Sequence, residues 1–230
     1  MSVADVLGSA VAVGATLGAY AAVDRASARL GRPALANPVL WSAVAVVAVL
    51  AVARVPVDDY TDAARPLRWL LAPATVALAA PLAREARVLA AGGWRLVLAV
   101  AAGGVVASLA GAGVALALGA PEALVEALAA KSVTTPIALA VVPGTATDSV
   151  VATAVVAAGT LGAIAVPALA RRAGLDRPVP LGLGMGVVAH AIGTAELAKR
   201  SPRAVGYGVA GLVLNGVVTA VWLPPLLRAL

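Results

Sequence analysis

Lys131-Ser132-Val133-Thr134-Thr135-Pro136 is the stretch that decides the fold, because it places a cation, three hydroxyls and a proline inside an apolar run from Ala127 to Thr147. Proline has no N–H and clashes with the preceding turn, so Pro136 predicts a helix break that frees carbonyls near positions 132 and 133. In a bilayer, a broken helix persists only where protein or a water-filled cavity takes over its hydrogen bonds. The break therefore predicts a binding site.

The polar side chains of this stretch allow two interpretations. The hydroxyls of Ser132, Thr134 and Thr135 are close enough in sequence to replace the freed hydrogen bonds, or to bind a solute that needs donors. The alternative is a kinked structural helix in which Lys131 extends to the lipid headgroups. Prolines with serine or threonine neighbours are common in membrane helices, so both interpretations stay open.

The composition is that of a membrane protein. Hydrophobic residues make up 62% of the chain and charged residues 12%, against about a quarter charged in soluble domains, and the mean hydropathy is +0.99. The net charge of +6 comes from short basic clusters between apolar runs, which is typical of loops at lipid headgroups and not of a nucleic-acid surface. We therefore expect an all-α polytopic membrane helical bundle that binds no nucleic acid.

The residue types also exclude several kinds of chemistry. The chain has no cysteine and one histidine, so disulfides, thiolate sites and histidine-based zinc sites cannot form. No pair of nucleophile and base is visible in the sequence. We expect neither an enzyme nor a cofactor.

The apolar runs predict seven or eight segments, because a spanning helix needs about 20 mostly apolar residues. Residues 1–5 contain an acid and no base, so we interpret the first run as a membrane helix and not as a signal peptide. The polar stretch 54–68 is expected to be a solvated loop. Besides the Lys131 segment, the runs are 6–23, 37–53, 69–83, 96–120, 149–170, 178–195 and 204–227.

A second interruption lies in the run 69–83, which is short, is broken by Pro73 and has Thr75 as its only hydroxyl. Short, proline-broken segments indicate discontinuous helices in transporters. The order of plain helix, broken segment and glycine-rich helix occurs twice along the chain. This order predicts a two-fold internal repeat with halves 37–120 and 148–230. Both halves belong to a single predicted transmembrane domain, 1–230. The distribution of basic residues favours a re-entrant Lys131 segment.

The stretch from His190 to Glu196 is the other place where polar groups enter an apolar run. His190 and Thr194 are four residues apart and share a helix face, and Gly193 removes side-chain bulk beside them. A histidine that lines a membrane cavity can bind or pass a proton. The alternative is a core histidine hydrogen-bonded to a carbonyl. Glu196 is expected to be a loop charge.

The glycine-rich runs carry two further features. Gly103, Ala107 and Gly111 recur every four residues, which predicts a face that another helix approaches closely. We interpret this face as packing and not as chemistry. In the last run, Asn215 is a single amide in apolar surroundings.

Five sequence blocks, in order along nearly the whole chain, resemble the LrgB/CidB family. The blocks are Thr16-Leu17-Gly18-Ala19-Tyr20, Asn37-Pro38-Val39-Leu40, Pro73-Ala74-Thr75-Val76-Ala77-Leu78-Ala79, Lys131-Ser132-Val133-Thr134-Thr135-Pro136-Ile137-Ala138 and His190-Ala191-Ile192-Gly193-Thr194-Ala195. The fourth and fifth together are specific. The chain departs from the family at Ala189, where serine is frequent, and at Glu196, where arginine is.

The resemblance implies two functional descriptions. Bacterial members are named antiholin-like and are linked to control of murein hydrolase activity and cell lysis. Plastid relatives, which are fused to an LrgA-like domain, resemble glycolate/glycerate carriers, and some bacterial relatives are associated with pyruvate movement. This chain contains no LrgA-like portion, so an LrgA/CidA-like membrane partner would be a separate protein.

Two hypotheses follow for a multi-pass protein embedded in the lipid bilayer of the plasma (inner) membrane. The first is a secondary transporter of small organic anions such as pyruvate or glycolate. The second is an antiholin-like regulator of murein hydrolase export and lysis, which acts through a holin-like partner or as a homo-oligomer. The substrate-binding residues expected under the first hypothesis are Lys131, Ser132, Thr134, Thr135, Pro136, Thr75, His190, Gly193, Thr194 and Asn215.

Overall fold

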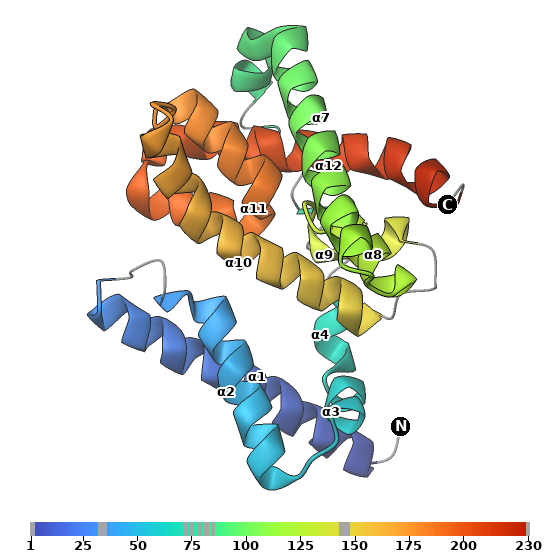
Figure 1. The fold of residues 1–230 in the computed structure, drawn as a ribbon. Helices are drawn as coiled ribbons and strands as arrows, with labels where there is room; N and C mark the ends of the chain where they lie inside the picture. The colour runs from blue at the N-terminus through green and yellow to red at the C-terminus, as the bar shows by residue number, and fades with distance from the viewer. Residues whose placement is uncertain are drawn as a thin grey trace. The chain divides into compact units, whose positions relative to one another are not determined.

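The computed structural model describes residues 3–31, 36–70, 73, 76–77, 80, 83, 86–142 and 148–228. All regular secondary structure in these residues is helical, which confirms the all-α prediction (Figure 1). The chain divides into two compact units, residues 1–77 and residues 78–230, and each is described by itself.

The first unit contains α1 (Val3–Arg29), α2 (Pro38–Ala53), α3 (Val57–Ala63) and α4 (Arg65–Trp69). The side chain of Asn37 caps α2, because its Oδ1 accepts hydrogen bonds from the N–H groups of Val39 and Leu40 at 2.9 and 3.3 Å. This cap satisfies two of the donors that a helix start leaves open. The hydroxyls of Thr16 and Tyr60 lie 2.6 Å apart and join α1 to α3.

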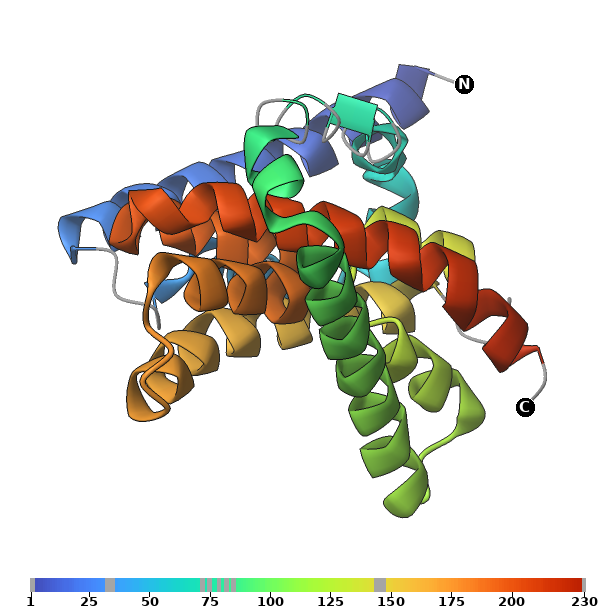
Figure 2. The same cartoon turned by 90° about the horizontal axis from the view of Figure 1, so that it is seen from above.

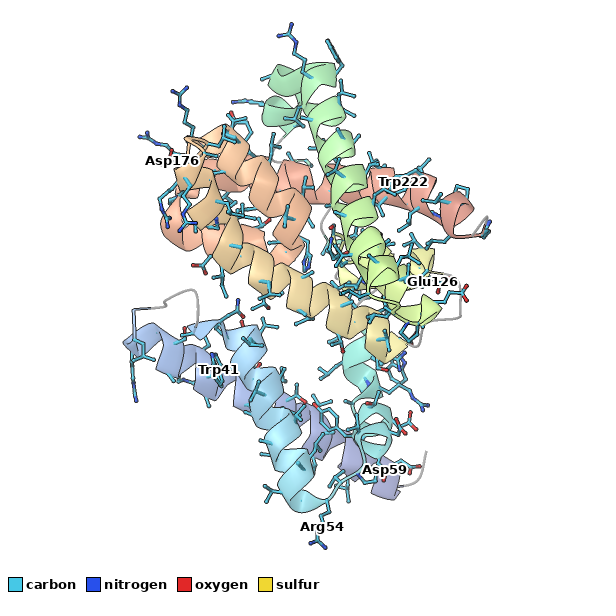
Figure 3. All side chains as sticks on the ribbon, in the orientation of Figure 1. Trp41, Arg54, Asp59, Glu126, Asp176 and Trp222 are labelled. Atoms are coloured by element: carbon cyan, nitrogen blue, oxygen red, sulfur yellow. The ribbon has the colours of Figure 1, made fainter. Side chains whose placement is uncertain are left out.

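The prediction of a loop at 54–68 was wrong, because this stretch forms α3 and α4. Arg54 ends α2 in a left-handed conformation, with φ of 54°, and points away from the helix (Figure 3). The chain then turns by 120° into α3. Asp58 and Asp59 lie in the first turn of α3, where negative charge stabilises a helix start. Polar residues in this stretch thus stabilise short helices.

The second unit contains α7 (Ala86–Ala117), α8 (Glu122–Ala129), α9 (Thr135–Val141), α10 (Asp148–Arg172), α11 (Pro178–Arg200), a 3-10 turn (Pro202–Ala204) and α12 (Val205–Leu227). Helix α11 lies between α10 and α12, and α7 crosses α12 (Figure 2). Glycines allow α11 and α12 to approach closely: a side chain at Gly182 would lie 2.5 Å from the carbonyl oxygen of Ala204, and one at Gly186 would overlap the backbone of Gly208. The glycine-rich runs therefore serve close packing.

The main buried apolar cluster of this unit surrounds the break between α8 and α9. It draws on α8, the break and α9, which follow one another in the chain, and on α10 and the end of α12. Its buried members are Ala127, Ala129, Ala130, Val133, Ala138, Val141, Val151, Ala154, Val155, Leu223 and Leu227.

Five helices in the described part of the chain are long and apolar enough to cross a membrane: Asp5–Arg29, Ala90–Ala117, Asp148–Arg172, Pro178–Ala198 and Pro202–Leu227. The bent pair α2 and α3 would make a sixth. This finding supports a multi-pass membrane protein. The total of seven or eight segments and the internal repeat stay predictions, and most of the run 69–83, including Thr75, lies outside the described residues.

Candidate functional site

The predicted helix break is present between α8 and α9. Helix α8 ends at Ala129 and α9 begins at Thr135, with Pro136 in its first turn, where a missing N–H costs no hydrogen bond. Ser132, Val133 and Thr134 are buried in the break, at 3%, 1% and 8% exposure. An interrupted backbone thus lies inside an apolar unit.

Lys131 is half-buried and lies against α7. Its Nζ donates a hydrogen bond to the carbonyl oxygen of Ala107 at 2.7 Å, and the Oγ of Ser132 lies 3.4 Å from the same nitrogen. Gly111 leaves room for the amine, because a Cβ at that position would be 2.8 Å from Cε of Lys131. The face of α7 that carries Gly103, Ala107 and Gly111 therefore contacts a polar group, in addition to the helix packing that we predicted.

Asn215 of α12 is completely buried and contacts three other segments, namely the break, α11 and α7. Its Nδ2 donates to the carbonyl oxygen of Ser132 at 2.7 Å and lies 3.5 Å from that of Val187 on α11. Its Oδ1 contacts Gly104 of α7, where any side chain would overlap it. The Ser132 carbonyl near the break is thus bonded by a remote amide and not by the neighbouring hydroxyls.

His190 interrupts α11. Its backbone has φ of 39° and ψ of −129°, outside the helical region, and its side chain is 3% exposed. The Nε2 lies 3.0 Å from the carbonyl oxygen of Val155 on α10. A carbonyl only accepts, so Nε2 carries the proton. This is the geometry of the second interpretation, a core histidine bonded to a carbonyl.

The residues that follow His190 pack tightly. Thr194 donates to the carbonyl oxygen of His190 at 2.9 Å. A Cβ at Gly193 would lie 2.6 Å from that of Ala189, so this glycine is needed where α11 bends. The expectation that Glu196 is a loop charge was wrong, because α11 continues to Arg200 and Glu196 is only 6% exposed.

Several buried polar atoms near the break have no hydrogen-bond partner in the described part of the chain. They are Ser108 Oγ on α7, Thr134 Oγ1 in the break, and Asn215 Oδ1 and Thr219 Oγ1 on α12. Such atoms are rare in folded proteins, because an unsatisfied buried polar group costs about 1–3 kcal/mol. A ligand or water would satisfy them.

The sequence patterns did not indicate Gly104, Ser108 or Thr219 as site residues. They also did not indicate the buried Glu126 of α8 (Figure 3). The helical spacing contains a signal for two of them. Ser108 follows Gly104 by one turn, and Thr219 follows Asn215 by one turn, so each shares a face with a residue at the site. Glu126 interacts with another group and is therefore not a free charge.

The structure divides the predicted site residues into two clusters. Lys131, Ser132 and Asn215 meet where α7, the break and α12 come together, next to Thr134, Thr135 and Pro136 at the start of α9. The second cluster comprises His190, Gly193 and Thr194 of α11. Its residues contact α10, α12 and other residues of α11. Asn215 also approaches α11 through Val187, so it links the two interrupted segments.

The first cluster offers groups that can bind an anion. Among the described residues, no group of three or more His, Cys, Asp or Glu side chains could hold a metal ion. The cluster combines an ammonium group, hydroxyls and an amide. It can therefore neutralise and hydrogen-bond a small anion.

The chain has apolar helices of spanning length, and a buried amide is hydrogen-bonded to its interrupted segment. These features define an integral membrane protein of the polytopic helical class. Irregular backbone at such depth is tolerated where protein surrounds it. Within this class, the chain belongs to the LrgB-like family, whose model matches residues 16–229.

Relatives in several bacteria resemble the chain over most of their length. An uncharacterised protein of Haemophilus influenzae is 32% identical over 82% of both chains. YwbG of Bacillus subtilis is 30% identical over 83% of this chain and 85% of its own. A Bacillus cereus protein named antiholin-like protein LrgB is 25% identical over 83% of each chain. No solved structure matches the chain.

Proposed function

We propose that the protein is a secondary transporter of small organic anions, monocarboxylates of the pyruvate and glycolate type, in the plasma (inner) membrane. The substrate carboxylate binds at the first cluster, where Lys131 supplies the positive charge. Ser132 and Thr134 supply hydroxyl groups at the same helix break.

The observation that carries this proposal is the surroundings of the Lys131 amine. Its hydrogen-bonding groups in the described part of the chain are neutral, namely the carbonyl oxygen of Ala107 and the hydroxyl of Ser132. Taking an ammonium group out of water is costly unless it is paired with an opposite charge. A carboxylate substrate would supply that charge when it binds.

The position of the break gives further support. Secondary transporters bind their substrates where helices are discontinuous, near the middle of the membrane. Asn215 connects the break to α11, which is itself interrupted at His190. A substrate at Lys131 would therefore act on both interrupted segments. We assign His190 the role of holding α11 against α10, through its contact with the carbonyl oxygen of Val155.

Uptake of labelled pyruvate, lactate or glycolate into proteoliposomes tests the proposal. We expect uptake by the wild type and loss of uptake in Lys131→Ala, with partial retention in Lys131→Arg. Arg95→Ala is the matched control, because it removes another cation at α7, the helix that Lys131 contacts. Cζ of Arg95 lies 5.8 Å from the centre of the Trp94 ring. Absence of flux for every short acid, under proton and sodium gradients alike, would refute transport.

The second candidate is an antiholin-like regulator, which the name of the Bacillus cereus relative favours. It would act through a holin-like membrane partner or through homo-oligomers. Two glycines of α12 are already packed within this unit, because Gly208 packs on Leu197 and Gly211 on the backbone of Leu183. Under this candidate, Lys131→Ala leaves lysis control intact, which a lysis assay in a strain lacking the gene would show.

A further inference from the structure

Gly111 on α7 lies against the side chain of Lys131. A Cβ at position 111 would be 2.8 Å from Cε and 3.0 Å from Nζ of Lys131. Both distances are shorter than an ordinary van der Waals contact, so a side chain at this position would displace the amine. The observed position of the positive charge therefore requires that residue 111 has no side chain.

The Lys131 amine occupies a place that helix geometry normally closes. Side chains of a helix tilt toward its N-terminus, so each one covers the turn that precedes its own Cα. A side chain at position 111 would thus cover the carbonyl oxygen of Ala107, one turn earlier. Glycine leaves this oxygen open, and Nζ of Lys131 donates a hydrogen bond to it at 2.7 Å. Gly111 and the Ala107 carbonyl together form a recess in α7, which we call the amine notch.

The amine notch leaves part of the ammonium group for a ligand. An ammonium group has three N–H donors. The described residues supply two acceptors, the carbonyl oxygen of Ala107 at 2.7 Å and the hydroxyl oxygen of Ser132 at 3.4 Å. A third donor is left for a carboxylate, and its direction is fixed once the other two are bonded. The amine notch therefore decides where the charge meets a substrate.

The same glycine brings the end of α8 against α7, and the two helices lie side by side (Figure 1). A Cβ at position 111 would lie 2.7 Å from the backbone carbonyl oxygen of Leu128, in the last turn of α8. Lys131 follows the end of α8 at Ala129 by two residues. Gly111 thus fixes both the start of the break and the tip of its lysine side chain against α7.

We infer that Gly111 is a positioning residue for the substrate. By keeping the amine notch open, it sets the place of the Lys131 charge and hence the affinity for small carboxylates. This inference rests on the proposed transport function. A glycine that served helix packing alone would affect stability and leave affinity unchanged, so the two roles predict different results for the same variant.

Uptake kinetics of Gly111→Ala in proteoliposomes test the inference. We expect KM for pyruvate to rise by about tenfold or more, because a displaced ammonium group loses its charge-assisted hydrogen bond to the carboxylate. We expect kcat per folded protein to stay within about twofold, because that bond is made equally in the bound state and during transport. Gly113→Ala is the matched control on the same helix, because a Cβ there would meet nothing within 4 Å.

Acylation of the Lys131 amine tests its position without transport. Lys131 and Lys199 are the two lysines of the chain, so mass spectrometry of the separate peptides follows each one. The solubilised, substrate-free protein is treated with acetic anhydride. We expect Lys131 to react several times faster in Gly111→Ala than in the wild type, because the amine has lost its bond to the carbonyl of Ala107. Gly113→Ala should react like the wild type.

The possible results separate the inference from the proposed transport. An unchanged KM in Gly111→Ala with a lowered Tm would show that this glycine serves packing alone, and would overturn the inference while leaving transport standing. Equal acylation of Lys131 in Gly111→Ala and the wild type would also overturn it. Absence of uptake by the wild type refutes the transport function itself, and acylation then still tests the amine notch.

The wild type decides the question if Gly111→Ala does not fold. Slower acylation of Lys131 in the folded protein than in the protein unfolded in SDS and urea supports the amine notch. Equal rates in the two states would mean that α7 does not hold the amine, and would overturn the inference.

Discussion

The side-chain amide of Asn215 donates a hydrogen bond of 2.7 Å to the carbonyl oxygen of Ser132, across 83 positions of the chain. Proline at position 136 interrupts the helix around this carbonyl, and the amide on α12 bonds to it. The strength of the bond comes from its burial, because neither group has access to water as an alternative partner.

Replacing Asn215 tests the importance of this bond for folding. Asn215→Ala leaves the Ser132 carbonyl buried without its donor, so we expect the free energy of unfolding to fall by about 1–3 kcal/mol. Unfolding in mixed detergent micelles measures the change. Thr219→Val is the matched control one turn away, because it removes a hydroxyl that has no partner in the described residues. An Asn215→Ala protein as stable as the wild type would contradict this prediction.

The backbone at His190 predicts an unusual effect of glycine. Side chains are strained at a φ of 39°, whereas glycine adopts positive φ freely. We expect His190→Gly to be more stable than His190→Ala by about 1 kcal/mol or more, since such strain costs about 1–3 kcal/mol. Both variants lose the imidazole, so the difference isolates the backbone.

The neighbouring Ala191 provides the control for His190. It lies in α11 without the unusual φ, and glycine in a helix costs about 1 kcal/mol relative to alanine. The order of glycine and alanine should therefore reverse between positions 190 and 191. The same order at both positions would show that His190 is not strained.

Gly159 on α10 is predicted to be necessary for the position of His190. A Cβ there would lie 2.5 Å from Nε2 of the imidazole, so Gly159→Ala displaces the ring from the carbonyl of Val155. We expect a loss of about 1–3 kcal/mol in unfolding free energy. Gly184→Ala is the control, with its Cβ 3.5 Å from Val166.

A double-mutant cycle makes the Gly159 test specific. If the imidazole is the obstacle, Gly159→Ala should cost much less in a His190→Ala background. Equal costs in both backgrounds would place the clash elsewhere.

The short helices at the break predict that the Lys131 segment is re-entrant. Helices α8 and α9 have 8 and 7 residues, so each is only about 10–12 Å long, against a hydrocarbon core of about 30 Å. Single cysteines at Glu122 and Ser149, at the starts of α8 and α10, should be labelled from the same side of the membrane, and the chain has no native cysteine to interfere. Labelling from opposite sides would show that the segment crosses.

Local sequence rules predicted individual elements well and their partners poorly. The predicted run 37–53 begins at Asn37, the residue that caps α2, and Pro136 predicted the break. Both agree with the structure because capping and proline sterics act within a few residues. The prediction of a loop at 54–68 is wrong because it treats charge as a sign of irregular structure, whereas acidic residues stabilise helix starts. The prediction of Glu196 as a loop charge is wrong because the apolar run ends at position 195, whereas α11 continues to Arg200.

The sequence by itself determined that the chain is an all-helical membrane protein with an interrupted segment at Lys131, because hydropathy and proline geometry are properties of residues close together in the chain. Only the tertiary structure decided that Asn215 bonds the Ser132 carbonyl and that the Lys131 amine lies on α7. These contacts depend on how distant helices pack, and close packing is set by the shapes of whole helix faces. No short stretch of sequence carries that information.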